Sequence, residues 1–231
     1  MFLRTVLKRI FYTSNTIRYQ VEWARIKEAL SSIGYHNVVF DGGCGSGEYL
    51  KRIQSANLCK EIVGLEYDEE NFKKLLSNLE GKENVKVVRG SLLEAPFPDS
   101  FADLVMSTQV LEHIEEHEKA ASELNRLLKP GGYAIITVPH PPEPFPNDGH
   151  VREGYTEADL IALFSDFRWE HLSTDYFLTR STIHAMVAAE KLPLKGKFLP
   201  LGFINKESTM SAEERRKDTP FGILAIFKKP L

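Results

Sequence analysis

The fold of this chain follows from the stretch VVFDGGCGSG, residues 38–47. Three β-favouring apolar residues end at the acid Asp41, and glycines then recur at every second position, at Gly43, Gly45 and Gly47. This pattern indicates a buried parallel strand that stops at its carboxyl end and turns sharply into a helix. Glycine is needed there because a side chain would clash or hold a ligand away from the backbone. Since the first N–H groups of the helix are unpaired, the turn predicts a site for a nucleotide-like ligand.

The spacing of the glycines restricts which nucleotide fits. Dinucleotide-binding turns read G-x-G-x-x-G, and their third glycine packs the helix on the strand. Glu48 stands at that place here, and its carboxylate would repel a pyrophosphate. A P-loop is excluded because no Gly-Lys-Ser/Thr follows. An acid at the end of the strand suits a ligand with a positive group, such as the amino end of S-adenosylmethionine (SAM).

With these residues the chain resembles the class I SAM-dependent methyltransferases, in particular a methyltransferase type 11-like branch that acts on small molecules. The first motif of this superfamily commonly reads as an acid and then G-x-G-x-G. Matches to later segments follow in order at residues 94–103 (EAPFPDSFAD), 110–114 (VLEHI) and 128–132 (LKPGG). The resemblance covers about residues 35–140. It implies a Rossmann-like, doubly wound α/β sheet of seven mostly parallel strands, and an enzyme that uses SAM as cofactor.

Strand-like and helix-like segments alternate through the first 140 residues, as in a parallel sheet covered on both faces. Pro130-Gly131-Gly132 is expected to stop a helix that runs through 122–129. Residues 156–164 read as a short helix with a capping-box-like start. The other helices are expected at 17–33, 47–56 and 69–79, and the strands at 37–41, 61–66, 85–89, 101–107, 133–138, 169–174 and 221–227.

The chain divides into an N-terminal helical segment, residues 1–34, and a methyltransferase domain, residues 35–231. The N-terminal segment is expected to act as a lid or a packing arm. Residues 175–220 separate the last two strands by more chain than a compact domain normally needs. We therefore expect this insertion to cap the substrate pocket.

Composition limits the partners and the compartment. A net charge of −3 gives no long-range attraction to nucleic acid, so none is expected as a partner. Cys44 and Cys59 form neither a disulfide framework nor a metal-ligand spacing, which favours a reducing cytoplasm. Residues 1–11 have basic residues within an apolar run, so they lack a signal-peptide core. They could contact a membrane surface or a lipid substrate. The alternative is packing against their own domain or against the second subunit of a homodimer.

Ligands of doubly wound sheets bind outside the carboxyl ends of the strands. The resemblance implies that Asp41 helps hold the methionyl end of SAM, while Gly43, Cys44, Gly45 and Gly47 let the backbone approach it.

Glu66 ends the second strand, where its carboxylate can accept hydrogen bonds from both ribose hydroxyls. Tyr67 is expected beside the adenine, with packing under the next helix as the alternative. Ser91 stands where the family often has an acid that binds the adenine amino group, and a hydroxyl accepts that bond more weakly. The N–H of Leu92 could serve the adenine ring, and Gln109 would border the transferred methyl.

Methyl transfer from a sulfonium is an in-line displacement, so the enzyme mainly supplies alignment and a dry pocket. An oxygen nucleophile of high pKa also needs a base. His113, His140 and His150 are the candidates near the ligand edge of the sheet. No metal is expected, because His140, Asp148 and His150 have no recognised ligand spacing.

The sequence therefore predicts a SAM-dependent methyltransferase that acts on a small or medium organic acceptor, at oxygen rather than nitrogen or carbon. One alternative is a catalytically silent SAM-binding or partner-binding module. A further alternative is a methyltransferase of protein or RNA. The Asn-Pro-Pro-Tyr-like motif of the amino-methylating branch is absent after the fourth strand, where residues 107–110 read STQV.

Overall fold

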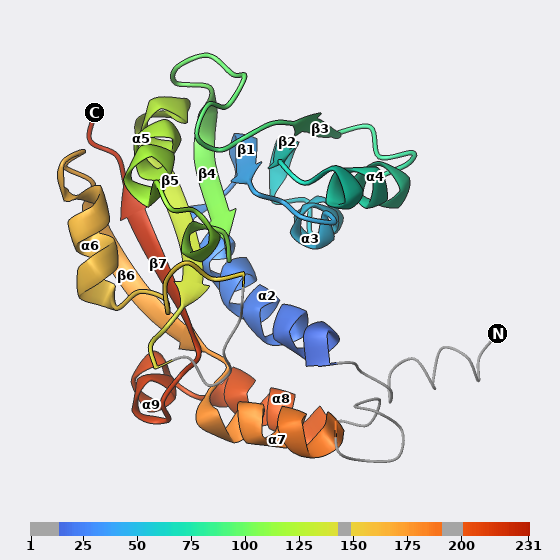
Figure 1. Cartoon of the computed structure of the whole chain (residues 1–231), viewed down its shortest axis with the longest axis vertical. Coiled ribbons are helices and arrows are strands. Elements are labelled where there is room, and N and C mark those ends of the chain that lie inside the picture. The colour runs from blue at the N-terminus through green and yellow to red at the C-terminus, as the bar shows by residue number, and fades with distance from the viewer. Residues whose placement is uncertain (1–13, 143–148, 191–200) are drawn as a thin grey trace.

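In the computed structural model, residues 14–142, 149–190 and 201–231 are described. They form a seven-stranded sheet in the order β3-β2-β1-β4-β5-β7-β6 (Figure 1). Strands β1 to β5 pair in parallel, and β7 pairs antiparallel with both β5 and β6, so six of the seven strands point the same way. The α/β, doubly wound, mostly parallel sheet is therefore confirmed. The strands are β1 (His36–Gly42), β2 (Cys59–Glu66), β3 (Val85–Arg89), β4 (Ala102–Thr108), β5 (Leu128–Pro139), β6 (Glu170–Phe177) and β7 (Gly222–Lys228).

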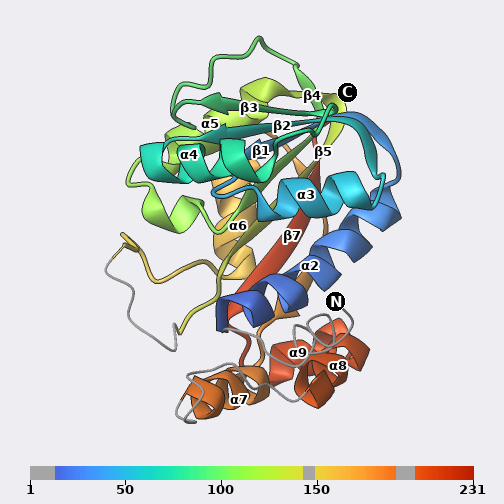
Figure 2. The ribbon, with the colours of Figure 1, turned by 90° about the vertical axis from the view of Figure 1, so that its right-hand side faces the viewer.

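Helices cover both faces of this sheet, because the central parallel strands are apolar on both sides. One buried cluster joins the sheet to α2 and α3, and a second joins it to α5 and α6 (Figure 2). The helix α6 begins with the expected capping box, in which Thr156 and Asp159 exchange hydrogen bonds. The helices are α2 (Ser14–Ile33), α3 (Glu48–Ser55), α4 (Glu69–Asn78), the 3₁₀ turn η1 (Leu111–His113), α5 (His117–Leu127), α6 (Glu157–Ser165), α7 (Arg180–Glu190), α8 (Leu201–Thr209) and α9 (Ala212–Lys217).

The Pro130-Gly131-Gly132 segment is not a helix stop. The helix α5 ends at Leu127 and β5 begins at Leu128. The prediction that the helix runs through residue 129 is therefore wrong at its C-terminal end. Gly131 has φ 75° and donates its N–H to the carbonyl of Lys229, whose own N–H donates to the carbonyl of Gly132. The three residues form an irregular start of a strand, held by the C-terminal end of the chain.

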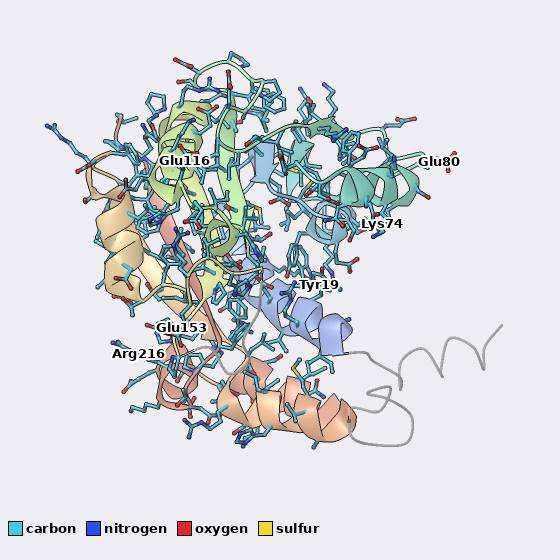
Figure 3. All side chains as sticks on the ribbon, in the orientation of Figure 1. Tyr19, Lys74, Glu80, Glu116, Glu153 and Arg216 are labelled. Carbon is cyan, nitrogen blue, oxygen red and sulfur yellow. The ribbon has the colours of Figure 1, made fainter. Side chains whose placement is uncertain are left out.

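The helix α2 packs on the domain that follows it. Tyr19, which is labelled in Figure 3, belongs to α2. Its ring centroid lies 5.6 Å from that of Tyr49 in α3. The carboxylate of Glu22, which is fully buried, accepts 2.6 Å hydrogen bonds from the hydroxyls of Tyr49 and Thr137. The described part of the N-terminal segment thus packs on the domain, and its role as a lid or a packing arm stays a prediction. Residues 1–11 lie outside the described ranges, so lipid contact and a homodimer stay predictions.

The described part of the insertion at 175–220 contains three helices beyond the end of β6. Both α7 and α8 pack against α2, and α9 packs against β6. The loop before α7 is held by Glu207 of α8, whose carboxylate accepts a 2.6 Å hydrogen bond from the N–H of Leu178. Within the described ranges, none of the helices has the length and apolar character needed to cross a membrane.

Candidate functional site

A cavity of about 540 Å³ lies across the carboxyl ends of β1, β2, β3 and β4. The strand order reverses between β1 and β4, which is where doubly wound sheets bind ligands. The volume is in the usual range for small-molecule sites, roughly 300–1,000 Å³. The walls are formed by residues 43, 45, 65–67, 71, 90–93, 109–110 and 113–116. No residue of the insertion is among these described walls, so its role as a cap stays a prediction.

The glycine turn closes one end of the cavity. Gly43 has φ 89°, and a Cβ there would lie 2.5 Å from the side chain of Val110. Its N–H donates a 2.8 Å hydrogen bond to the carbonyl of Leu65, and Cys44 donates to the same oxygen at 3.0 Å. Cys44 is buried, and burial raises the pKa of its thiol. This cysteine therefore fills space beneath the turn and does not form the cavity wall.

Glu66 links the turn to the next helix. Its Oε2 accepts a 2.7 Å hydrogen bond from the N–H of Gly45, and its Oε1 accepts one of 2.8 Å from the N–H of Asp68. Asp68 in turn caps α4 by accepting from the N–H of Asn71. Each Glu66 oxygen keeps a second lone pair, and the side chain lies on the cavity wall. The carboxylate can therefore still accept two hydroxyl groups of a ligand.

Asp41 lies at the end of β1 behind the cavity wall and is fully buried. Neither of its carboxylate oxygens has a hydrogen-bond partner among the described residues. Burial raises the pKa of Asp41 to about 7, and the negative charges of Glu66 and Glu22 add to the shift. Because buried polar groups are nearly always hydrogen-bonded, this carboxylate fits a site that is completed by a positively charged donor.

The cavity wall also includes the residues expected near the adenine and the methyl group. Tyr67 is 75% exposed, so it does not pack under the next helix. The Oγ of Ser91 accepts a hydrogen bond of 3.1 Å from the N–H of Leu93, and its hydroxyl hydrogen remains available. Leu92 and Gln109 also line the cavity. Gln109 has φ 55°, and its side-chain nitrogen is buried without a hydrogen-bond partner among the described residues.

The structure brings two of the three candidate histidines together. His113 lines the cavity, and its ring meets the ring of His150 edge-on with centroids 4.7 Å apart. His140 is not on the described wall. Its ring packs against Tyr176 instead, at 5.6 Å, and burial lowers the pKa of His140.

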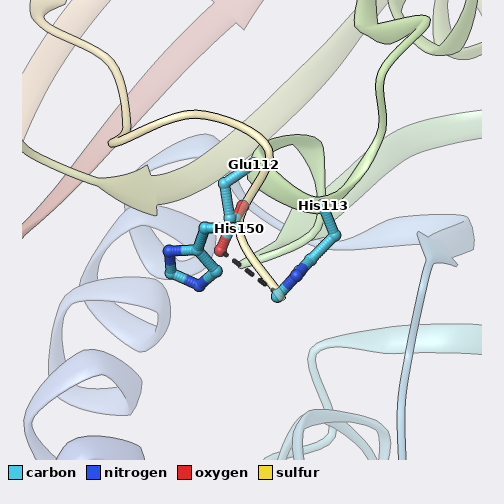
Figure 4. Close-up of side chains that lie close together, drawn as sticks. All are labelled: Glu112, His113 and His150. Carbon is cyan, nitrogen blue, oxygen red and sulfur yellow. Dashed lines mark ion pairs between the residues drawn. The ribbon is translucent and has the colours of Figure 1, made fainter. Parts of the chain in front are cut away.

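Glu112 is a site residue that the sequence analysis did not identify. Its side chain is buried, and its Oε1 lies 4.0 Å from the Nε2 of His113. One ligand atom each from Glu112, His113 and His150 lie within 4.8 Å of one another (Figure 4). Asp148, which was considered with His140 and His150, lies outside the described residues. The neighbouring Glu-His pair was visible in the VLEHI motif, but the approach of His150 depends on the tertiary fold.

Comparison with known families and sequences gives a consistent result. Residues 40–136 match the family described as "Methyltransferase domain". A protein of Mycolicibacterium smegmatis named "Probable S-adenosylmethionine-dependent methyltransferase" is 32% identical over 102 residues, which cover 44% of this chain and 38% of that protein. A demethylmenaquinone methyltransferase of Staphylococcus aureus is 26% identical over 135 residues, which cover 57% of this chain and 56% of that protein. A tRNA (carboxymethyluridine(34)-5-O)-methyltransferase of Arabidopsis thaliana is 30% identical over 120 residues, which cover 51% of this chain and 28% of that protein. The chain thus spans about a quarter to a little over half of these relatives.

Solved structures share the fold over nearly the whole chain. A SAM-dependent methyltransferase of Archaeoglobus fulgidus has a TM-score of 0.64 and 20% identity, and the match covers 89% of this chain and 92% of that one. The [4+2]-cyclase SpnF has the same TM-score with 19% identity, covering 90% and 82%. Since a protein named as a cyclase shares this architecture, the fold by itself does not determine the reaction.

Proposed function

We propose that this chain, whose central domain belongs to the class I SAM-dependent methyltransferase superfamily, transfers a methyl group from SAM to an organic acceptor. One observation carries the proposal. A glycine turn tied by Glu66 stands beside the fully buried Asp41, whose carboxylate has no hydrogen-bond partner among the described residues. A nucleoside with a cationic amino acid end matches both features.

The residues of the cavity suggest how SAM is held. Glu66 would accept the ribose hydroxyls with its remaining lone pairs, and Asp41 would favour the methionyl ammonium. Tyr67, Ser91 and Leu92 would surround the adenine. When bound, SAM supplies an electrophilic methyl group on a sulfonium. The part of the protein in the reaction is to hold the acceptor in line with that methyl and to exclude water.

We propose an oxygen atom of a small or medium organic molecule as the acceptor. An alcohol or phenol must lose its proton as the new carbon–oxygen bond forms, so a base near the acceptor accelerates transfer. His113 lies on the cavity wall and His150 packs against it, which supports these two as base candidates over His140. The named relatives act on a tRNA and on demethylmenaquinone, so they do not select one acceptor class. The net charge of −3 disfavours a nucleic acid.

The second candidate function is a silent module that binds SAM or a partner without turnover. Asp41, the glycine turn and Glu66 support binding of the nucleoside, and binding alone does not establish turnover. We also propose a cytoplasmic location, since both cysteines are free and buried.

Calorimetric titration with S-adenosylhomocysteine, followed by transfer of labelled methyl from SAM to a panel of acceptors, tests the proposal. We expect saturable binding and labelled product with hydroxyl acceptors. Absence of binding would remove the proposed function. Binding without transfer to any alcohol, phenol, amine, carbon acid, protein or RNA of the panel would favour the silent module.

A further inference from the structure

We propose that Glu112, His113 and His150 form a binding site for a divalent transition metal at the edge of the cavity. The set consists of two imidazole nitrogens and one carboxylate. This is a donor set of catalytic zinc sites, which keep a fourth position open. Metal binding itself does not depend on the proposed methyl transfer. A role of the metal in holding an oxygen acceptor does rest on the proposed methyl transfer.

The separations of the ligand atoms are close to those that a metal needs. Oε1 of Glu112 and Nε2 of His113 are 4.0 Å apart. One ligand atom from each of the three residues lies within 4.8 Å of the other two. Bonds of about 2.0–2.2 Å to a tetrahedral zinc place neighbouring ligand atoms roughly 3.3 Å apart. Closure therefore requires small movements. The His113 side chain is 43% exposed, which leaves room for such a movement.

A hydrogen bond of His113 leaves its Nε2 available as a metal ligand. Its Nδ1 lies 2.7 Å from the carbonyl oxygen of Gly149. Since a carbonyl only accepts, Nδ1 must carry the hydrogen, and the neutral ring then has its lone pair on Nε2. That is the nitrogen nearest Glu112 (Figure 4). A ring N–H donated to a backbone carbonyl is the usual way in which metal-binding histidines are oriented.

Hydrogen bonds of the residues before and after His150 hold its backbone in place. Gly149 before it accepts from His113, and Val151 after it donates its N–H to the carbonyl of Glu112 at 2.9 Å. Arg152 adds hydrogen bonds of 2.6 Å and 2.7 Å to the carbonyls of Leu111 and Ile114. These bonds hold the segment against η1, so the three ligands are prearranged across two distant parts of the chain.

The position of the site indicates the class of acceptor it would favour. His113 borders the cavity, so the open coordination position would be reached from there. A metal ion lowers the pKa of a coordinated oxygen acid. An acceptor hydroxyl bound there would lose its proton to solvent. Its oxygen would then form the bond to the methyl carbon as the carbon–sulfur bond of SAM breaks and S-adenosylhomocysteine leaves. In the metal-bound form the two imidazoles would therefore be ligands, and the base role proposed for them above would apply to the metal-free form.

Zinc titration of chelator-treated protein tests the site without any turnover. We expect one equivalent of Zn²⁺ to bind the parent chain. Affinity should fall by about 100-fold or more in His113→Ala and His150→Ala, because even residues that only support metal ligands contribute 10–100-fold. His184→Ala, at an exposed histidine of α7, is the matched control and should bind zinc as the parent does.

Circular dichroism and urea unfolding report whether each variant is folded, and neither measurement depends on binding of S-adenosylhomocysteine. Glu112→Gln keeps the shape of the side chain and gives a second measurement if a histidine variant fails to fold. A parent chain without a saturable zinc site, or a folded His150→Ala variant that binds zinc as tightly as the parent, would overturn the proposal. Failure of the nucleoside to bind the parent would count against the proposed function and leave the zinc result interpretable.

Discussion

The Oε2 of Glu66 accepts a 2.7 Å hydrogen bond from the backbone N–H of Gly45, which ties the end of β2 to the turn after β1. The same carboxylate lies on the cavity wall. One side chain therefore shapes the glycine turn and remains available to a ligand. Binding and local structure are coupled at this residue, and the predictions below separate the two.

Replacement of Glu66 by alanine should weaken binding of S-adenosylhomocysteine by about 10- to 100-fold. Hydrogen bonds to a charged group contribute roughly 1.5–3 kcal/mol, and each 1.4 kcal/mol changes affinity tenfold. Glu70→Ala, at an exposed acid in the first turn of α4, is the control and should bind as the parent does. Calorimetry measures both. Equal affinity in Glu66→Ala and the parent would refute the role of Glu66.

Gly45 and Gly81 form a matched pair for a second prediction. Both have positive φ, 54° and 76°, and a Cβ at either would meet no atom within 4 Å. Alanine at either position should lower the free energy of unfolding by about 1–2 kcal/mol, because a residue with a Cβ is strained in the left-handed conformation. Only Gly45 lines the cavity, so only Gly45→Ala should also lose nucleoside binding. Urea unfolding and calorimetry separate these effects, and equal binding by the two variants would contradict the expectation.

Asp41 should make the stability of the empty protein depend on pH. Burial raises its pKa to about 7 in the folded state, against about 3.9 in an unfolded chain. The folded state therefore binds the proton more tightly, and its contribution to stability falls as pH rises from about 4 to about 7. Asp41→Asn should melt at a higher temperature than the parent at pH 8, with a smaller difference at pH 5.

The same variant should bind S-adenosylhomocysteine more weakly at pH 8, because asparagine offers no charge to the ammonium. Asp166→Asn, at an exposed aspartate, should change neither property. Thermal unfolding at two pH values and calorimetry provide the measurements. An Asp41→Asn variant that is less stable than the parent at pH 8 would show that the buried carboxylate is satisfied in the empty protein.

The attachment of α2 can be tested at Tyr49. Its hydroxyl donates to the buried carboxylate of Glu22, so Tyr49→Phe leaves that acid with one donor fewer. The free energy of unfolding should fall by about 1–3 kcal/mol. Tyr35→Phe, at a side chain that is 60% exposed, should change it by less than about 0.5 kcal/mol. Urea unfolding followed by circular dichroism gives both values, and similar results for the two variants would count against the interaction.

The part of the site that the sequence predicted rests on local patterns. Asp41 and Glu66 each end an apolar run, and the parallel pairing of β1 with β2 brings both to one edge of the sheet. The glycine turn is equally local, since its residues are consecutive. The helix and strand order also followed from hydrophobic runs and breakers, and residues 40–136 match a methyltransferase domain.

The remaining features depend on contacts between distant segments. Gly131 and Gly132 read as a helix stop, yet pairing with Lys229 makes them part of a strand. No local pattern marks Glu22 as a buried acid, because only the packing of α2 brings it against Thr137. His150 reaches His113 because the following residues bind the backbone of η1. No local pattern carries this information.

The place of β7 has a consequence for how the chain folds during synthesis. It follows all the other described strands in the sequence, yet it lies between β5 and β6 in the sheet. Within the described ranges, β6 pairs with β7 alone. A nascent chain cannot complete this edge until residues 222–228 have left the ribosome, and until then two strand edges are open to other chains. Premature termination before residue 222 would therefore yield an aggregating product.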